Sequence, residues 1–479
     1  MIDIAILEPL VRIAWLVGAV AFVIGLARMN SPATARKGNL LSAGGMAIAI
    51  AATALYLLLR PNTTTGNNLL IGWVIIVVGI AIGGGLGLYT ARTVKMTAMP
   101  QLVSLFNAVG GGAAALIAID GYLRISSGAV VAAPGLQENV ATVLDIVIGS
   151  ITFTGSLIAS GKLMGRIPGK PIMVPGGQLV TGGLALIVVV GAVFLWIGNY
   201  SLPAMVLILA ASLIFGVTMT LPIGGADMPV VISLLNSFTG TAVAMAGFVL
   251  ENPVLIIAGA LVGASGAILT KLMADAMNRS VLNIMVGGFG GGDAVAGIVG
   301  AEGASVREVG VDDAAIQLAY AQHVIVVPGY GLAVAQAQHA VRELAELLES
   351  RGVDVKYAIH PVAGRMPGHM NVLLAEANVP YPQLKEMDDI NPEFERADVA
   401  LVIGANDVTN PAARRAGTPV SGMPILDVDH AKSIIVMKRS MGKGYAGIDN
   451  ELYTNPKTGM LFADAKDGLA ALTAAVKAL

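Results

Sequence analysis

The sequence has no cysteine and few charged residues, and each shortage excludes a class of function. Without cysteine the protein has no disulfide, no catalytic thiolate and no thiolate ligand for a metal. No metal site of another kind is predicted either. Only 13% of the 479 residues are charged, whereas a soluble domain carries about 25%. The formal net charge of −2 argues against a nucleic-acid partner. Much of the chain is therefore expected to lie in lipid.

The scarce charges are unevenly distributed along the chain. Residues 1–277 contain 12 Lys or Arg and 8 Asp or Glu, and the remaining 202 residues contain the other 40 charged side chains. This division predicts a transmembrane domain at 1–277, a flexible glycine-rich linker at 278–310 and a soluble domain at 311–479. The Gly288-x-Gly290 pair inside the linker is similar to a phosphate loop, but the helix and second strand of a nucleotide-binding unit do not follow it.

Nine apolar runs in the first domain are long enough to cross a bilayer, which takes about 20 residues in a helix. They lie near residues 9–28, 39–60, 69–90, 98–119, 139–161, 178–198, 202–221, 228–250 and 253–275. Connectors after even-numbered runs carry only Arg60 and Arg124, whereas connectors after odd-numbered runs carry most of the Lys and Arg. Since cytoplasmic loops are enriched in these residues, we expect an extracytoplasmic N-terminus and a cytoplasmic soluble domain.

Small residues are dense within these runs. Glycine clusters occur at 83–87, 110–112 and 259–263. Because small residues let helices approach closely, we interpret the clusters as helix-packing sites, with a pore lining as the alternative.

Polar residues inside a membrane span are costly and are candidates for function. The densest group spans residues 227–241, where Ser233, Asn236 and Gly240 fall on one helical face. We expect Asn236 to face the bundle near mid-membrane and Asp227 to lie at its cytoplasmic end. Both are candidates for a transport route, with an interhelical hydrogen bond as the alternative.

Histidine is absent from the membrane half, because all five histidines lie in the soluble part. Histidine is the usual proton carrier near neutral pH. If protons cross, the titrating group is therefore a carboxylate, a water chain or a side chain of another subunit. Asn107 and Asp145 complete the inventory of polar residues within the runs.

The soluble part shows an alternation of strand and helix patterns. A β-branched run leads into Pro328-Gly-Tyr-Gly331 and then a long helical pattern, which is typical of a dinucleotide-binding unit. Strands are predicted at 324–327, 353–359, 398–403 and 433–437, and helices at 332–350, 369–377, just after Asn410 and at 464–478. The predicted fold is thus a polytopic α-helical membrane domain of about nine transmembrane helices followed by a Rossmann-like α/β domain with a doubly wound parallel sheet.

The strand ends indicate which nucleotide binds. The second strand ends without the acid that NAD sites use for the ribose 2′-OH, whereas Lys438-Arg439-Ser440 follow the 433–437 strand. Two cations and a hydroxyl fit a 2′-phosphate through charge-assisted hydrogen bonds. NADP(H) is therefore favoured over NAD(H), with a solvated charge pair as the alternative.

Three other loops belong to the same crevice. The loop at 361–368 offers backbone amides and Arg365, and the loop at 404–410 offers amides and Asp407. Residues 441–447 combine glycine hinges with Tyr445, a composition that suits a lid over the nucleotide.

With these motifs together, the chain resembles the β subunit of the proton-translocating NAD(P) transhydrogenase over essentially its whole length. The resemblance is carried by residues 224–231 (GGADMPVV), 328–337 (PGYGLAVAQA), 360–371 (HPVAGRMPGHMN), 404–407 (GAND) and 438–447 (KRSMGKGYAG). Some members have a histidine where Asn107 stands here, which puts a relay through position 107 in doubt and favours a histidine of the α subunit.

The resemblance implies a Si–Re-specific enzyme of the bacterial inner membrane that produces NADPH from NADH. Hydride would pass directly between two nicotinamides, and proton entry would drive the transfer. NADP(H) would bind to this chain, and NAD(H) to a partner α subunit with further transmembrane helices. The complete complex would be a dimer in membrane lipid.

The family pattern also implies roles for residues. Tyr330 and its turn would hold the pyrophosphate, Lys438 and Arg439 the 2′-phosphate, and Asp407 would sense protonation. The candidate residues for proton route and coupling are Asp227, Asn236 and Asp407. The candidate cofactor-binding residues are Gly329, Tyr330, Gly331, Ala333, Val334, Ala335, Val362, Ala363, Gly364, Arg365, Met366, Pro367, Gly404, Ala405, Asn406, Asp407, Lys438, Arg439, Ser440, Met441, Gly444, Tyr445, Ala446 and Gly447.

Two other functions fit parts of the pattern. One is an NADP(H)-sensing membrane channel or transporter without redox chemistry, but the sequence shows neither a selectivity filter nor inverted repeats. The other is a membrane-anchored NADP-dependent oxidoreductase, for which nine spans are more than an anchor needs. A neighbouring reading frame that encodes an NAD-binding domain with a few transmembrane helices would favour the transhydrogenase.

Overall fold

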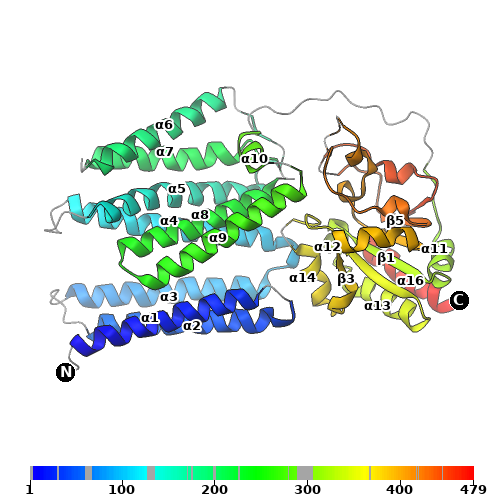
Figure 1. The fold of residues 1–479 in the computed structure, drawn as a ribbon, viewed down its shortest axis with the longest axis horizontal. Coiled ribbons are helices and arrows are strands. Elements are labelled where there is room, and N and C mark those ends of the chain that lie inside the picture. The colour runs from blue at the N-terminus through cyan, green and yellow to red at the C-terminus, as the bar shows by residue number, and fades with distance from the viewer. Residues whose placement is uncertain are drawn as a thin grey trace. The chain divides into compact units, whose positions relative to one another are not determined.

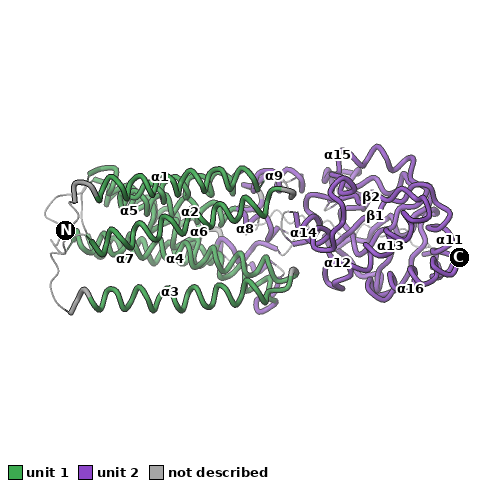
Figure 2. The backbone as a smooth tube through the Cα atoms, turned by 90° about the horizontal axis from the view of Figure 1, so that it is seen from below, with its two compact units in different colours: residues 1–164, 178–218, 234–267 green, residues 165–177, 219–233, 268–479 purple. Residues whose placement is uncertain are grey.

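The structure is a computed structural model that describes most of the chain. The described residues are 4–29, 32–59, 67–126, 135–169, 171–173, 176–197, 201–224, 227–278, 280–287, 306–365, 368–416, 418, 420–444 and 446–479. They form two compact units (Figure 2). Unit 1 comprises residues 1–164, 178–218 and 234–267, and unit 2 comprises residues 165–177, 219–233 and 268–479.

The described residues contain nine helices that are long and apolar enough to cross a membrane, as expected (Figure 1). They are α1 (Ile4–Arg28), α2 (Pro32–Leu59), α3 (Asn67–Thr93), α4 (Met99–Ser126), α5 (Leu136–Leu163), α6 (Gly177–Trp196), α7 (Leu202–Thr220), α8 (Met228–Val249) and α9 (Pro253–Ala276). Two polar side chains of α4, Gln101 and Ser104, donate to backbone carbonyls of α5.

The helix-packing interpretation is confirmed for two glycine clusters and stays a prediction for the third. A Cβ added to Gly111 of α4 would lie 2.7 Å from the Cβ of Thr152 in α5, and one added to Gly259 of α9 would lie 2.8 Å from the Cα of Ala244 in α8. The glycines at 83–87 of α3, in contrast, have no described atom within 4 Å of an added Cβ. The reason is that the described part of the chain packs nothing against this stretch of α3.

The α/β domain is built on one six-stranded parallel sheet. Its strands are β1 (His323–Pro328), β2 (Asp354–Ile359), β3 (Leu384–Glu386), β4 (Val399–Ile403), β5 (Ser433–Lys438) and β6 (Thr458–Phe462). Their order is β3-β2-β1-β4-β5-β6, and every pair is parallel. The chain thus builds outward from β1 to β3 on one side and from β4 to β6 on the other. The order reverses between β1 and β4, which confirms the doubly wound sheet.

Helices cover the sheet and connect its strands (Figure 1). They are α11 (Val311–Ala319), α12 (Tyr330–Val334), α13 (Gln338–Ser350), α14 (His369–Glu376), α15 (Met387–Ile390) and α16 (Ala465–Ala478), with short 3₁₀ turns between them. Another short helix, α10 (Val281–Gly287), precedes them in the chain. The sheet interior is a continuous apolar core, because parallel strands are buried on both faces. Ile325, Val402 and Val436 of neighbouring strands are each fully or almost fully buried there.

The turn region after β1 differs from the prediction. The helix expected at 332–350 is two helices, α12 and α13, separated where Gln336 adopts a positive φ of 51°. The break turns Val334 outward, so its side chain is 44% exposed, whereas Val341 and Leu344 of α13 are buried as expected. Strands β3 and β6 were not predicted; they pair with β2 and β5 at the two edges of the sheet.

The linker expected at 278–310 stays a prediction. Its first part forms α10, and residues 288–305, including the Gly288-x-Gly290 pair, lie outside the described residues.

Candidate functional site

The four loops that carry the predicted cofactor-binding residues follow four neighbouring strands. The strands lie in the order β2-β1-β4-β5, so the loops after them meet at one edge of the sheet. The loops are residues 329–335 after β1, 360–368 after β2, 404–410 after β4 and 439–447 after β5. Three of the predicted residues, Met366, Pro367 and Tyr445, lie outside the described residues.

The turns after β1 and β4 cross each other with their backbones in direct contact. Glycine makes this crossing possible, because a side chain would not fit between the two backbones. The N–H of Gly329 donates to Ile403 O at 2.9 Å, and the N–H of Gly331 donates to Gly404 O at 3.0 Å. A Cβ on Gly331 would lie 2.6 Å from Gly404 Cα, and a Cβ on Gly329 would overlap the backbone of Ala405. Gly404 has a φ of +65°, which glycine adopts without strain. Dinucleotides bind at this point of a doubly wound sheet.

Some of the predicted residues can offer only their backbone. Ala333, Ala363 and Ala405 are 1–5% exposed, since their side chains pack inward. The prediction of their contact with a nucleotide therefore rests on their N–H and C=O groups.

Tyr330 lies beside Arg365 of the loop after β2 and His369, the first residue of α14. The guanidinium carbon of Arg365 lies 4.4 Å from the Tyr330 ring centroid, and the His369 ring centroid lies 6.2 Å from it. The backbone N–H of Arg365 donates to His369 Nδ1 at 3.1 Å, so the neutral ring carries its proton on Nε2. That nitrogen is buried and has no hydrogen-bond partner among the described residues. An unpaired buried donor beside a stacked tyrosine and arginine fits an acceptor supplied by a bound molecule.

His360 fixes the start of the same loop. Its Nδ1 accepts a hydrogen bond from the N–H of Val362 at 3.2 Å, so Nε2 carries the proton and donates to Pro424 O at 2.8 Å. The side chain is 1% exposed. Burial lowers the pKa of His360 from 6.5 to about 4, and the hydrogen bond to Pro424 opposes this shift only in part. His360 therefore joins two loops as a neutral imidazole.

Acid is expected to weaken the His360 contact. The pKa is lower in the folded state than in the unfolded state, so the unfolded chain binds the extra proton between pH 6.5 and 4. Stability is full above pH 6.5 and falls by about 1.4 kcal/mol per unit below it, to a loss of about 3 kcal/mol at pH 4. Hydrogen exchange of peptides covering 357–364 and 423–426, corrected for the intrinsic pH effect, should show protection falling from pH 7 to pH 5.

The His360→Gln variant is the control for this effect. Glutamine keeps a donor toward Pro424 but cannot titrate, so its exchange should not change in this pH window. Equal pH dependence in the variant and the unaltered protein would show that His360 is not responsible.

The lid segment, residues 441–447, folds back onto Asp407. The Asp407 Oδ2 atom accepts a hydrogen bond from the N–H of Ala446 at 3.0 Å. A Cβ on Gly444 would lie 2.6 Å from the Asp407 carboxyl carbon, so only glycine allows this approach. Gly447 has a φ of +71°, and its N–H donates to Gly444 O at 3.2 Å. An ionised carboxylate accepts a hydrogen bond more strongly than a protonated one. The ionisation of Asp407 therefore strengthens the hydrogen bond that holds the lid segment.

The two cations after β5 differ in what they contact. Lys438 Nζ donates to Gly442 O and lies 4.8 Å from the Tyr453 ring centroid. Burial lowers the pKa of Lys438, and Asp407 opposes this shift. Arg439 is exposed and has no ion pair or hydrogen bond within the described residues. Its guanidinium is therefore open to an anionic ligand, whereas Lys438 also holds the turn.

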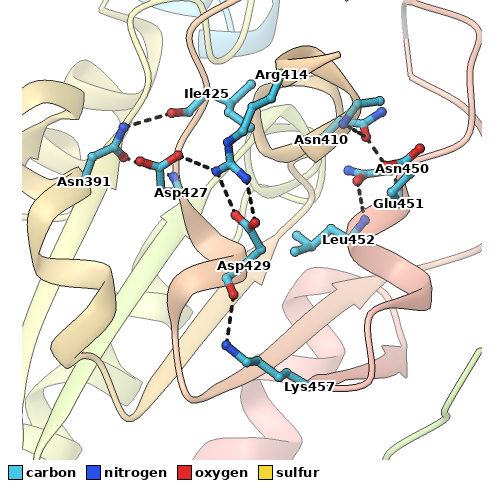
Figure 3. A network of polar contacts seen from close by, with 11 residues as sticks. Asn391, Asn410, Arg414, Ile425, Asp427, Asp429, Asn450, Glu451, Leu452 and Lys457 are labelled. Atoms are coloured by element: carbon cyan, nitrogen blue, oxygen red, sulfur yellow. Dashed lines mark hydrogen bonds and ion pairs between the residues drawn. The ribbon is translucent and has the colours of Figure 1, made fainter.

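Two buried asparagines join the loop after β4 to the segment after the lid (Figure 3). Asn410 Nδ2 donates to Asp449 O at 3.1 Å, and Asn410 Oδ1 accepts from the N–H of Glu451 at 3.3 Å. Asn450 Nδ2 donates to Asn406 O at 2.9 Å. Both ends of the lid segment are thus anchored, one by β5 and the other by this pair.

A second network of hydrogen bonds and ion pairs holds the segment between β4 and β5 in place. Arg414 donates to the carboxylates of Asp427 and Asp429, and Asn391 bonds both Ile425 O and the N–H of Asp427 (Figure 3). These polar groups are engaged with one another. They hold the loop that carries Pro424, the acceptor of the His360 bond.

Three residues of the site, His360, His369 and Asn450, were not predicted from the sequence. The two histidines lie inside the 360–371 motif, one directly after a strand and one at a helix start, and that placement could have drawn attention to them. Asn450 donates a hydrogen bond to Asn406, which lies 44 positions earlier in the chain. No local sequence pattern indicates such a partner.

Comparison with known proteins decides the family. A family model described as "NAD(P) transhydrogenase beta subunit" matches residues 11–475. A Rhodospirillum rubrum protein named "NAD(P) transhydrogenase subunit beta" is 50% identical over 466 residues, which cover 96% of this chain and 97% of that protein. A second protein of the same name, from a named strain of Rhodospirillum rubrum, has the same identity and the same coverage. The chain belongs to the NAD(P) transhydrogenase beta subunit family.

Membership in the transhydrogenase family makes the chain a part of an oxidoreductase that acts on nicotinamide nucleotides. A beta subunit implies an alpha subunit as its partner. The nine apolar helices make it a membrane protein.

The other two predicted residues lie directly before α8 and within it. Asp227 precedes the first residue of α8, is 9% exposed, and its C=O accepts from the N–H of Val231. A negative charge at a helix N-terminus is favourable. Asn236 is half-buried, and the described residues give its amide no hydrogen-bond partner. Next to it, Ser237 donates to Gly263 O of α9 at 2.7 Å. Asn236 therefore lies at the edge of the face that packs on α9.

Proposed function

We propose that this chain is the NADP(H)-binding and proton-translocating subunit of the transhydrogenase. Together with an alpha subunit that binds NAD(H), it transfers hydride between NADH and NADP⁺ and couples the transfer to the passage of protons. The reaction runs toward NADPH when protons enter the cytoplasm, with the Si–Re stereospecificity of the family.

One observation carries the assignment of the nucleotide. The turns after β1 and β4 lie beside the end of β5, where the described residues give the Arg439 guanidinium no partner. Strand β2 ends at Ile359, and His360 follows it in place of an acid. A 2′-phosphate needs a cation and an NAD ribose needs a carboxylate. This combination supports NADP(H) on this chain.

The residues around the crossing fit the dinucleotide. The turn of Gly329 to Gly331 brings backbone close to a pyrophosphate, with Tyr330 and Arg365 stacked beside it. The buried His369 Nε2–H and the lid segment supply a further donor and a cover. When bound, the nicotinamide of NADP(H) gives or receives the hydride. The chain orients the nucleotide, and Asp407 links the lid segment to a titratable carboxylate.

The arrangement of the complex follows from what the chain offers. The described residues contain one dinucleotide-type sheet, whereas direct hydride transfer needs two nucleotides. The second nucleotide, NAD(H), is thus assigned to the alpha subunit, which also supplies further transmembrane helices. The Lys and Arg pattern supports an extracytoplasmic N-terminus and a cytoplasmic α/β domain in the bacterial inner membrane. The complete complex is proposed to be a dimer.

Coupling has an energetic purpose. The two nicotinamide couples have nearly equal chemical potential, so unassisted transfer barely favours either side. One charge crossing the membrane gives about 2.3 kcal/mol per 100 mV, or roughly 3.5–4.6 kcal/mol at 150–200 mV. To use this energy, the membrane domain must interact differently with the NADP⁺ and NADPH states of the α/β domain.

Reconstituted complex tests the proposal. Hydride transfer from NADPH to an NAD analogue is measured in vesicles with an imposed pH gradient, with and without an uncoupler. The final NADPH ratio should shift more than a hundredfold with the gradient and lose that shift when the uncoupler is added. A rate and ratio that ignore the gradient would contradict proton coupling. NADPH-dependent ion flux without hydride transfer would instead support a channel.

A further inference from the structure

Asp145 of α5 is the one acidic side chain in the described membrane helices that has no exposed surface. Neither carboxylate oxygen has a hydrogen-bond partner among the described residues. The side chain is fully enclosed by its own chain. An isolated charge in such a place is very costly.

Asp145 belongs to a buried polar stripe along α5. The members of the stripe recur three to seven residues apart on one face of the helix and are all buried: Thr142, Asp145, Thr152, Ser156 and Ser160. At 1.5 Å per residue the stripe is about 27 Å long, close to the roughly 30 Å thickness of the hydrocarbon core. A polar stripe of this length runs from one side of a bilayer nearly to the other.

The stripe faces α4 across a close contact. Ser160 Oγ donates to Gln101 O at 3.1 Å, and Ser104 Oγ donates to Ser156 O at 2.8 Å. One turn from Asp145, a Cβ on Gly149 would lie 3.0 Å from the Cβ of Ala115. Small side chains on both helices therefore line the seam in which the carboxyl lies.

The neighbouring helices bring no opposite charge to Asp145. On α4, Asp120 and Arg124 pair with each other at 2.8 Å, and both side chains are more than 60% exposed. On α5 itself, the other charged residues are Glu138 and Lys162, two turns before and more than four turns after Asp145. Helices α6, α7 and α8 contain no Asp, Glu, Lys, Arg or His. The environment thus favours the neutral acid over the carboxylate.

We propose that Asp145 is a proton-binding residue of the membrane domain, on which the translocated proton rests during its passage. The carboxylate takes up one proton from one aqueous side and becomes a neutral acid, and it then releases that proton toward the other side. Only an O–H bond forms and breaks, and no electron moves. The hydroxyl groups of the stripe supply the polar surroundings for the transfer. This inference rests on the proposed proton coupling.

The Asp145→Asn variant of the full complex tests the proposal, because asparagine has the shape of the neutral acid but cannot titrate. Proton uptake into vesicles should fall at least tenfold, while NADPH affinity stays within twofold. The infrared band of a protonated carboxylic acid, present in the unaltered complex, should disappear. Ser150→Ala is the matched control, since its hydroxyl is also buried on α5 without a partner. That variant should pump normally.

The outcomes separate this inference from the proposed function. Normal uptake in Asp145→Asn, or an equal loss in Ser150→Ala, would overturn the role of Asp145 and leave the function intact. Absence of uptake in the unaltered complex would overturn both. If Asp145→Asn fails to assemble, Asp145→Glu replaces it. Its carboxylic-acid band must shift and its uptake must persist, and either failure overturns the proposal.

Discussion

Replacing Gly329 with alanine is expected to reduce NADPH affinity more than a hundredfold. The added Cβ would overlap the backbone N and Cα of Ala405 and the carbonyl oxygen of Gly404. These are backbone atoms at the ends of two central strands, so they cannot move aside as a flexible side chain does. The loops after β1 and β4 must separate, and the hydrogen bond from Gly329 to Ile403 is lost. A cost near 3 kcal/mol corresponds to this factor.

Fluorescence titration of NADPH with the purified complex measures the effect. Gly310→Ala is the control, because Gly310 lies outside the loops of the site and its added Cβ would meet only Asp313 Oδ2 at 3.9 Å, an ordinary contact. That variant should bind NADPH within threefold of the unaltered protein. An unchanged affinity in Gly329→Ala would show that the crossing tolerates a side chain and that the nucleotide does not depend on it.

The membrane helices could be predicted because each depends on a property of its own segment. A run of about 20 apolar residues has few alternatives to a spanning helix. Packing between the helices could not be predicted in the same way. The glycines at 83–87 and at 110–112 look alike in sequence, yet only the second group meets another helix of the described chain. What packs on α3 depends on surfaces that its own sequence does not encode.

In the α/β domain, the errors occurred where local preferences were weak or misleading. Strand β3 has three residues and β6 contains Gly459, so neither has the β-branched run that revealed β1. The break between α12 and α13 lies in a sequence of good helix formers, and Gln336 takes its positive φ because Ala337 must bond back to Leu332 O. Tertiary contacts overrode propensity there.

The loops of the candidate site could be predicted together because parallel strands end at the same edge of a sheet. The residues that position those loops could not. His360 reaches Pro424 across 64 positions and Asn450 reaches Asn406 across 44. Such pairs are created by the fold, so a single sequence shows only one half of each.

Replacing Asn236 with alanine is expected to reduce proton uptake at least tenfold while leaving NADPH affinity within twofold. The side chain lies within α8, and the described chain gives its amide no partner. The substitution therefore breaks no hydrogen bond, and its effect on stability should stay below about 1 kcal/mol. A polar group that is costly in a membrane helix and serves no internal contact is a candidate for the route itself. Uptake is measured with a pH-sensitive dye in vesicles that contain the complete complex.

Thr241→Val on the same helix separates a specific effect from a general loss of polarity. The Thr241 hydroxyl donates to Ser237 O of its own helix at 2.9 Å, so valine keeps the shape and removes only an intrahelical bond. Pumping should remain normal in this variant. Normal pumping in Asn236→Ala would exclude its amide from the proton route. A parallel fall of NADPH affinity and uptake in Asn236→Ala would instead mean that the residue supports the structure of the membrane domain.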